Sequence, residues 1–127
     1  MKVAFDIDGT ITSQPAVFQH LMYVLRNSDE MKCEVLVLTS KKCGKDNCFV
    51  NANDFKFRFS QLEKFDIRQH VHYDTLMIAT GVDDVEIGAS KAKLLRELEV
   101  DVFIDDNVTF LALAKRTHPK LLCLKIF

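Results

Sequence analysis

Short apolar runs alternate with segments of helical periodicity along the chain. The apolar runs predict strands, which cover about Lys2 to Phe5, Cys33 to Leu38, part of His72 to Ala79, Val102 to Ile104 and Leu121 to Ile126. The run that ends at Leu38 is almost continuously apolar, as expected of a strand buried on both faces of a parallel sheet. The pattern is typical of an α/β protein.

Between these runs, apolar residues recur at helical spacing. A helix is predicted near Gln14 to Arg26, with Ser13 as its N-cap and Pro15 in its first turn. Ser90 is the expected N-cap of a later helix. The other predicted helices cover about Asp54 to Lys64, Lys91 to Glu99 and Val108 to Arg116.

The segment after the second strand is harder to interpret. From Cys43 to Asn53 the composition shifts to Gly, Asp, Asn and Lys, which predicts a loop. Beyond it, Phe55, Phe57 and Phe59 alternate as in a strand, whereas Phe55, Phe59 and Leu62 fit one helical face. We favour the helix because the next few residues continue its pattern.

Strands that alternate with helices predict a parallel sheet with helices on both faces. We therefore expect a three-layer α/β fold in which residues 1–127 form a single domain. In such sheets, ligands bind beyond the carboxyl ends of the strands. This rule selects three polar pairs that follow apolar strands: Asp6 with Asp8, Thr39 with Ser40, and Asp105 with Asp106.

Composition narrows the class of protein. The sequence is 48% hydrophobic and 28% charged, with a net charge of −1, so no broad positive field favours nucleic acid or a membrane surface. No window approaches the roughly 18 apolar residues that span a membrane. The charged start, Lys2 to Asp8, lacks the pattern of a signal peptide. We expect a cytoplasmic protein with no membrane association.

Four cysteines are too few and too scattered for a disulfide scaffold. Cys33 and Cys123 lie in apolar runs and are expected to be small buried side chains. Cys43 and Cys48 flank a loop. A zinc site there would need two more nearby ligands, so a reversible disulfide or free thiols are favoured.

Asp6 and Asp8 are candidate ligands for a cation. Two carboxylates this close repel each other unless a cation or a shared proton lies between them, and Mg²⁺ binds carboxylate oxygens while it keeps several waters. Gly9 permits a tight turn that lets the two carboxylates diverge, and Gly9 and Thr10 are candidate phosphate contacts. The alternative is an acidic strand end that simply leads into a glycine turn.

The polar pairs together predict a phosphate site with divided roles. Asp6 could attack phosphorus and form an aspartyl phosphate, while Asp8 could protonate the leaving oxygen and later deprotonate water. Thr39 and Ser40 can donate hydrogen bonds to phosphate oxygens. The site also needs a cation to offset negative charge, for which Lys91 and Lys93 are the candidates.

Each of these features has a purely structural alternative. A hydroxyl pair is common after any strand, the second acidic pair could cap the next helix, and both lysines could lie on a solvated helix face. The site is favoured by the joint occurrence of the motifs in order, each at a predicted strand end or helix start.

The motifs resemble those of the haloacid dehalogenase-like superfamily. The matching segments are Phe5 to Thr10, Leu38 to Ser40, Lys91, and Phe103 to Asp106. The resemblance covers most of the chain and implies a Rossmann-like fold and Mg²⁺-dependent phosphoryl transfer through an aspartyl phosphate. The stretch from Ser90 to Asp106 is also similar to small nucleotidase-like members.

The resemblance also implies a role for each matching residue. Asp6 resembles the nucleophile, and Asp8 the acid/base that is typical of the phosphatases. Thr39 and Lys91 match the residues that contact the phosphate. Asp6, Asp105 and the carbonyl oxygen of Asp8 match the Mg²⁺ ligands. Asp106 matches a residue that supports the metal site.

Two departures from the family pattern affect the expected substrate. Lys41 stands where an arginine often follows the hydroxyl pair. No segment is long enough for the cap domain of many members, and only residues 11–27 and 41–53 could cover the site. An open site suits a bulky or macromolecular substrate, or closure by a partner subunit.

We therefore expect a Mg²⁺-dependent phosphatase that hydrolyses a small phosphate monoester, with a nucleotide as one candidate. The first alternative is a receiver-like module that binds Mg²⁺ and accepts phosphate as a signal. In receivers, however, the paired acids and the phosphate acceptor usually lie on different strands. A second alternative is a degenerate member that serves as a binding partner, although no motif residue is missing.

Overall fold

The computed structural model describes residues 1–44 and 48–126. These residues form one sheet whose strands lie in the order β3-β2-β1-β4-β5. The strands are β1 (Lys2–Phe5), β2 (Glu34–Lys42), β3 (Thr75–Gly81), β4 (Val102–Asp105) and β5 (Leu122–Lys125). Every neighbouring pair runs parallel, which confirms the predicted parallel sheet.

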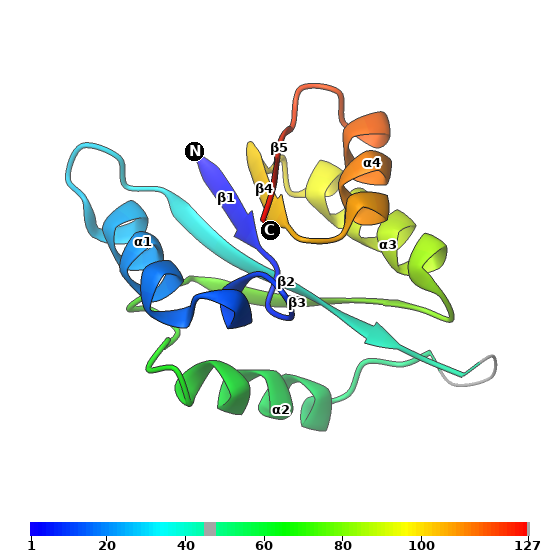
Figure 1. Ribbon diagram of the computed structural model, residues 1–127, viewed down its shortest axis with the longest axis horizontal. Coiled ribbons are helices and arrows are strands. Elements are labelled where there is room, and N and C mark those ends of the chain that lie inside the picture. Colours follow the sequence, from blue (N-terminus) through cyan, green and yellow to red (C-terminus); the bar gives the residue numbers. More distant parts are fainter. Residues whose placement is uncertain (45–47, 127) are drawn as a thin grey trace.

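Helices cover both faces of this sheet. They are α1 (Pro15–Asn27), α2 (Ala52–Glu63), α3 (Asp84–Glu97) and α4 (Val108–Thr117), and a short 3-10 helix, η1 (Ile11–Ser13), precedes α1. Figure 1 shows α1 and α2 on one side of the sheet and α3 and α4 on the other. The predicted three-layer, Rossmann-like fold is confirmed, and within residues 1–44 and 48–126 no large cap domain is added to it. None of the described helices is long and apolar enough to cross a membrane.

Alternation along the strands builds a separate core on each face of the sheet. On β1, Val3 and Phe5 pack with Phe18 of α1, whereas Ala4 packs in the cluster that contains Phe110 of α4. Because β1 lies at the centre of the sheet, its side chains are covered on both faces. Polar side chains can therefore reach a ligand only beyond the carboxyl end of the strand, where Asp6 follows.

Helix α3 begins seven residues before the predicted start, so the prediction of Ser90 as its N-cap is wrong. Asp83 caps the helix, and its side chain accepts a hydrogen bond from Glu86 N at 2.9 Å. The error has a physical cause. Ile87, Lys91 and Leu95 form one buried stripe, so a lysine interrupts the apolar pattern that marks a helix in the sequence. Lys91 consequently lies in the middle of α3 rather than at its start.

The other helices follow the predictions more closely. Pro15 begins α1, but Gln14 occupies the N-cap position and Ser13 ends η1, so Ser13 is not the cap. Helix α2 confirms the helical interpretation of the phenylalanine-rich segment. It starts two residues earlier than predicted because Asn51 and Asp54 form a capping box, with hydrogen bonds of 3.1 and 2.9 Å.

Strand β2 extends beyond the predicted strand end to Lys42. It stays in register with β3 as far as the pair Lys42 and Gly81, because backbone pairing does not depend on the side chains being apolar. The predicted loop from Cys43 to Asn53 therefore begins directly at the strand end. Residues 45–47 of that loop lie outside the described residues.

Candidate functional site

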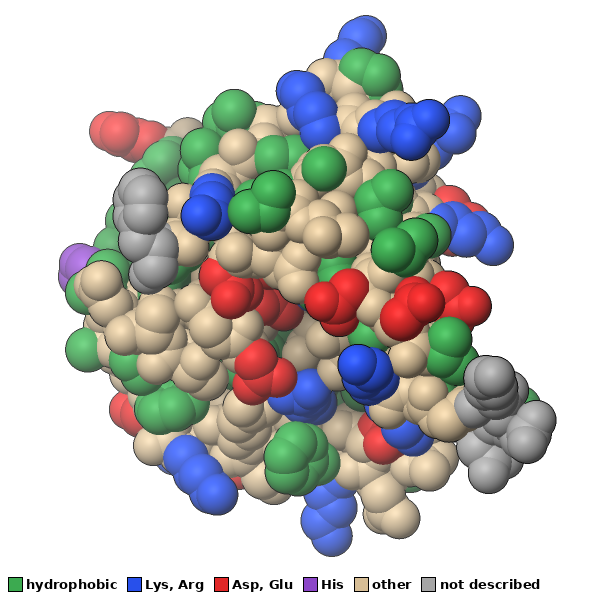
Figure 2. All heavy atoms as spheres, turned by 45° about the vertical axis from the view of Figure 1, so that its right-hand side comes forward, with side chains coloured by type: hydrophobic (Ala, Val, Ile, Leu, Met, Phe, Trp, Pro, Cys, Tyr) green, Lys and Arg blue, Asp and Glu red, His purple; other side chains and the backbone are tan. Residues whose placement is uncertain are grey.

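The carboxyl ends of β1 and β4 bring three acidic side chains together. These strands are neighbours, and Asp6 N donates a hydrogen bond to Ile104 O at 3.0 Å. One carboxylate oxygen each of Asp6, Asp105 and Asp106 lies within 4.8 Å of the others. Figure 2, which brings forward the side where β2 and β3 end, shows acidic side chains across the middle of this face, with lysines and arginines above and below them. Asp6 from the first predicted pair and both members of the pair Asp105 and Asp106 thus meet in one cluster.

Lys91 supplies the cation of this cluster. Its Nζ lies 2.9 Å from Asp6 Oδ1 and 2.9 Å from Asp105 Oδ2, and its side chain is fully buried. The rings of Phe110 and Phe103 lie 4.6 and 5.7 Å from Nζ, so α4 and β4 cover the charge on its other sides. The other candidate lysine, Lys93, is exposed and pairs only weakly with Glu97 at 3.9 Å.

The cluster carries more negative charge than Lys91 can balance. Burial raises the pKa of Asp6 to about 7 despite the opposing charge of Lys91, and the charge of Asp105 adds to the rise. Burial raises the pKa of Asp105 as well, again against the charge of Lys91. A further cation would relieve this imbalance. The donor set consists only of carboxylate oxygens, which suits a hard divalent ion such as Mg²⁺.

Asp8 is not one of the three clustered carboxylates. It lies on the turn after β1, and its side chain is 58% exposed. Its Oδ2 accepts a hydrogen bond from Arg58 Nη1 at 2.8 Å, and its Oδ1 accepts one from Gln61 Nε2 at 2.9 Å. The predicted divergence of Asp6 and Asp8 is therefore present, and helix α2 holds the second carboxylate.

These contacts set the charge state of Asp8. Partial burial acts to raise the pKa of the carboxyl, but the hydrogen bonds from Gln61 and Arg58, together with the charge of Arg58, lower the pKa of Asp8 below its usual value. The resting side chain is thus a carboxylate, and the lowered pKa makes it a weak base. It must leave Arg58 and take up a proton before it can donate one.

The sequence patterns did not predict Arg58 and Gln61 as residues of the site. Their only signal is that they stand three residues apart, among the phenylalanines of α2, and so share one helix face. Arg58 Nη1 also donates to Gln61 Oε1 at 2.8 Å, and Nη2 donates to Ser40 O at 2.7 Å. Arg58 therefore joins α2 to the end of β2 and to the turn after β1.

Thr39 has the one buried side-chain polar atom without a hydrogen-bond partner among the described residues. Its Oγ1 is fully enclosed at the carboxyl half of β2. Most buried hydroxyls in native proteins have a hydrogen-bond partner. The Thr39 hydroxyl is therefore available to form a hydrogen bond with a ligand. Ser40, the second member of the predicted pair, is half-buried, and its carbonyl is engaged by Arg58.

The glycine turn supports the acidic cluster. Gly9 has φ +82°, and a Cβ added there would overlap the carboxylate of Asp106. Its N–H donates to Thr12 Oγ1 at 2.8 Å, and the buried Thr10 Oγ1 donates to Asp106 Oδ1 at 3.4 Å. Both groups thus already have hydrogen-bond partners in the protein, and their predicted contacts with phosphate stay a prediction.

Replacing Gly9 with alanine is expected to destabilise the protein and weaken divalent-cation binding. The left-handed backbone alone costs a residue with a Cβ roughly 1–2 kcal/mol, and the methyl group must also displace Asp106. Urea unfolding and calorimetric titration with Mg²⁺ measure the two effects. Gly44→Ala is the matched control, because no atom of the described residues is found within 4 Å of a Cβ at that position. Equal stability and equal Mg²⁺ affinity of the two variants would show that the turn does not need glycine.

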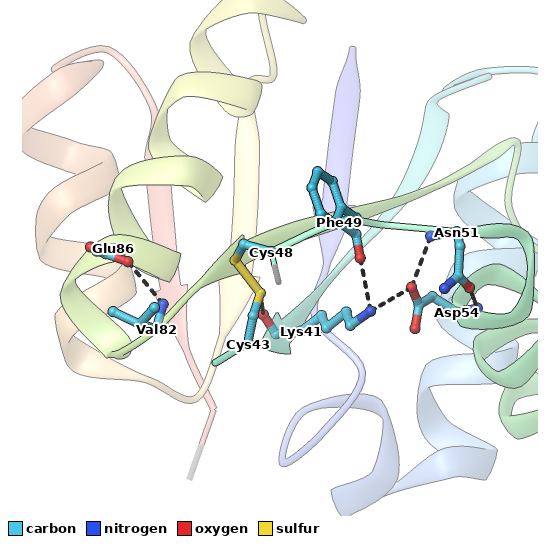
Figure 3. Close-up of a disulfide and its surroundings, with 8 residues drawn as sticks. All are labelled: Lys41, Cys43, Cys48, Phe49, Asn51, Asp54, Val82 and Glu86. Carbon is cyan, nitrogen blue, oxygen red and sulfur yellow. Dashed lines mark hydrogen bonds and ion pairs between the residues drawn. A yellow bond between two sulfur atoms is a disulfide. The ribbon is translucent and has the colours of Figure 1, made fainter. Parts of the chain in front are cut away.

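The segment after β2 is closed by a disulfide bond between Cys43 and Cys48, so neither of these thiols is available to a metal. Figure 3 shows this bond beside Lys41, whose Nζ donates to Phe49 O and to Asp54 Oδ2, each at 2.8 Å. Lys41 thus faces α2 rather than the acidic cluster. The other cysteines are free, with Cys33 buried and Cys123 half-buried.

Compared with family models and with curated proteins, the sequence gives no match.

Proposed function

We propose that this protein is a Mg²⁺-dependent phosphatase that hydrolyses a phosphate monoester through a phosphoryl group on Asp6. The proposal depends mainly on one observation. Three carboxylates gather at the carboxyl end of the central strands, and a fully buried lysine contacts two of them, at the edge where α/β sheets bind their ligands. The resemblance of the motifs to those of the haloacid dehalogenase-like superfamily supports the same function. We also propose that the protein acts in the cytoplasm.

The carboxylates of Asp6, Asp105 and Asp106, with the carbonyl oxygen of Asp8, would hold the Mg²⁺ ion. When bound, Mg²⁺ supplies positive charge to the phosphate oxygens and to the acidic side chains. The net negative charge and the raised pKa of Asp6 support a cation at this position.

Asp6 is the proposed nucleophile. A carboxylate oxygen attacks phosphorus, so a new O–P bond forms while the bond to the leaving oxygen breaks. Lys91 Nζ, 2.9 Å from Asp6 Oδ1, offsets the negative charge that develops on the phosphoryl oxygens. The unpartnered hydroxyl of Thr39 would donate a hydrogen bond to one of these oxygens.

Asp8 is the proposed proton carrier. Once released from Arg58 and protonated from solvent, its side chain would give that proton to the leaving oxygen and become a carboxylate. The carboxylate would then take a proton from the water that attacks phosphorus and releases phosphate, which regenerates the Asp6 carboxylate. A proton carrier two residues after the nucleophile favours turnover over a long-lived phosphoprotein, and hence a phosphatase over a receiver-like module.

Hydrolysis of an aryl phosphate tests this function. We expect steady release of phosphate that requires Mg²⁺ and falls to background in Asp6→Asn, since an amide cannot form the acyl phosphate. Asp29→Asn changes an exposed carboxyl between α1 and the amino end of β2, opposite the edge of the sheet that carries the site, and is expected to act like the wild type. Equal rates for Asp6→Asn and the wild type would remove Asp6 as the nucleophile.

A further inference from the structure

A small groove adjoins the candidate site between the end of β2 and helix α2. It has a volume of about 250 Å³, and its lining includes Ser40, Lys41, Lys42, Asp54, Phe57 and Arg58. Drug-sized ligands usually occupy pockets of roughly 300–1,000 Å³. The groove therefore suits a fragment about as large as one ring with a single substituent.

The groove and the acidic cluster are connected through Arg58. Its guanidinium lines the groove, yet Nη1 donates to Asp8 Oδ2 at 2.8 Å and Nη2 donates to Ser40 O at 2.7 Å. Ser40 directly follows Thr39, whose hydroxyl lacks a partner. A molecule whose phosphate reaches Thr39 and Asp6 would thus extend past Asp8 toward this groove.

The charges of the two regions are opposite. The charged side chains that line the groove are three cations, Lys41, Lys42 and Arg58, and one anion, Asp54. Lys41 is paired with Asp54 and Arg58 with Asp8, so Lys42 supplies the positive charge that no ion pair among the described residues offsets. The neighbouring cluster is acidic. A positively charged lining favours an anionic group, since charged hydrogen bonds are among the strongest that a protein offers. The exposed ring of Phe57 supplies an apolar surface beside these charges.

Lys41, one of the cations of the groove, is held in place by its neighbours. Lys41 Nζ is held at 2.8 Å by both Asp54 Oδ2 and Phe49 O, and the disulfide between Cys43 and Cys48 ties the chain before Phe49 to the end of β2 (Figure 3). A cation that is already positioned loses little freedom when a ligand binds.

We propose that this groove binds the leaving group of the substrate, and that this leaving group is small and carries its own anionic group, such as a carboxylate or a second phosphate. The inference rests on the proposed phosphatase function, in which the phosphate binds at Asp6. It assigns substrate selection to the end of β2 and to α2, and it favours a small metabolite over a bulky or macromolecular substrate.

Binding of two matched phosphonates tests the groove without turnover. Calorimetric titrations with Mg²⁺ present compare para-carboxybenzylphosphonate with para-carbamoylbenzylphosphonate, which differ only in the charge at the far end. We expect the wild type to prefer the carboxylate by on the order of tenfold, the effect of one charged hydrogen bond. The double variant Lys41→Met/Lys42→Met is expected to lose this preference. The exposed pair Lys56→Met/Lys64→Met is the matched control and should keep it.

The outcomes separate this inference from the proposed function. Suppose that the protein hydrolyses aryl phosphates. If the wild type then shows no preference for the carboxylate ligand, or if the groove variant keeps that preference, the groove assignment is overturned and the phosphatase assignment stands. A clear preference lost in the groove variant, without any hydrolysis, would support the groove and reject the phosphatase. Loss of the preference in the control pair as well would show that overall charge, not the groove, selects the ligand.

Discussion

Replacing Lys91 with methionine is expected to lower the free energy of unfolding by about 3–5 kcal/mol at about pH 8 without divalent cations. Methionine preserves most of the buried length but removes the charge that lies 2.9 Å from both Asp6 and Asp105. Those carboxylates then remain buried without their cation. Urea unfolding measures the loss, and Lys93→Met, two residues away on the exposed face of α3, is the matched control.

The destabilisation should depend on pH in a defined direction. Burial raises the pKa of Asp6 to about 7, from the 3.8 of an aspartate in an unfolded chain, so between these pH values the folded protein binds more protons than the unfolded one. The free energy of unfolding of the metal-free wild type therefore falls as the pH rises through about 7. Removing Lys91 raises the pKa of Asp6 further, because the lysine charge acts to lower it. The difference between Lys91→Met and the wild type should thus be small near pH 5 and large near pH 8.

Added Mg²⁺ provides an independent check on the charge balance. If the clustered carboxylates bind the ion, Mg²⁺ should restore part of the stability that Lys91→Met loses, because it replaces the missing positive charge. A variant as stable as Lys93→Met at about pH 8 would mean that Lys91 does not compensate the buried carboxylates.

Asp8→Asn is expected to reduce turnover by about 10²–10⁴-fold, the usual contribution of a general acid–base group. Asparagine keeps the shape of the side chain and an oxygen for Arg58 or Gln61, but it cannot carry a proton. With a good leaving group, attack by Asp6 needs little help from an acid, so the release step should slow more than the attack. Rapid-quench kinetics should therefore show a burst of the aryl alcohol followed by slow release of phosphate.

The burst distinguishes two accounts of Asp8. A rate equal to that of the Asp29→Asn control would remove Asp8 from the reaction. An equal fall in the burst and in the steady rate would instead assign Asp8 to the attack step or to the metal site alone.

The strand ends that form the site could be predicted from the sequence, because each apolar run gives way abruptly to polar residues there. In β1 and β4 the apolar pattern stops directly before Asp6 and Asp105. Since all the strands of a parallel sheet end at one edge, the sequence predicted that both acidic pairs lie at that edge, whereas the structure shows that β1 and β4 are neighbours there. The structure adds the distances and the central position of Lys91.

Other features had no signal in the sequence. The start of α3 was misplaced because a buried lysine occupies a position in the helix that is ordinarily apolar. The contact of Arg58 with Asp8 spans 50 residues and depends on where α2 packs, which local patterns do not specify. The extension of β2 to Lys42 arises from pairing with β3, which propensities of single residues do not reveal.

The most direct test of the proposed mechanism is to trap the phosphoryl group on Asp6. Asp8→Asn should be mixed with Mg²⁺ and an aryl phosphate, quenched in acid during the burst, digested, and examined by mass spectrometry. We predict one added phosphoryl group on Asp6, absent without Mg²⁺ and removed by hydroxylamine, as expected of an acyl phosphate. A burst with no label on the protein, or with the label on another residue, would contradict Asp6 as the nucleophile.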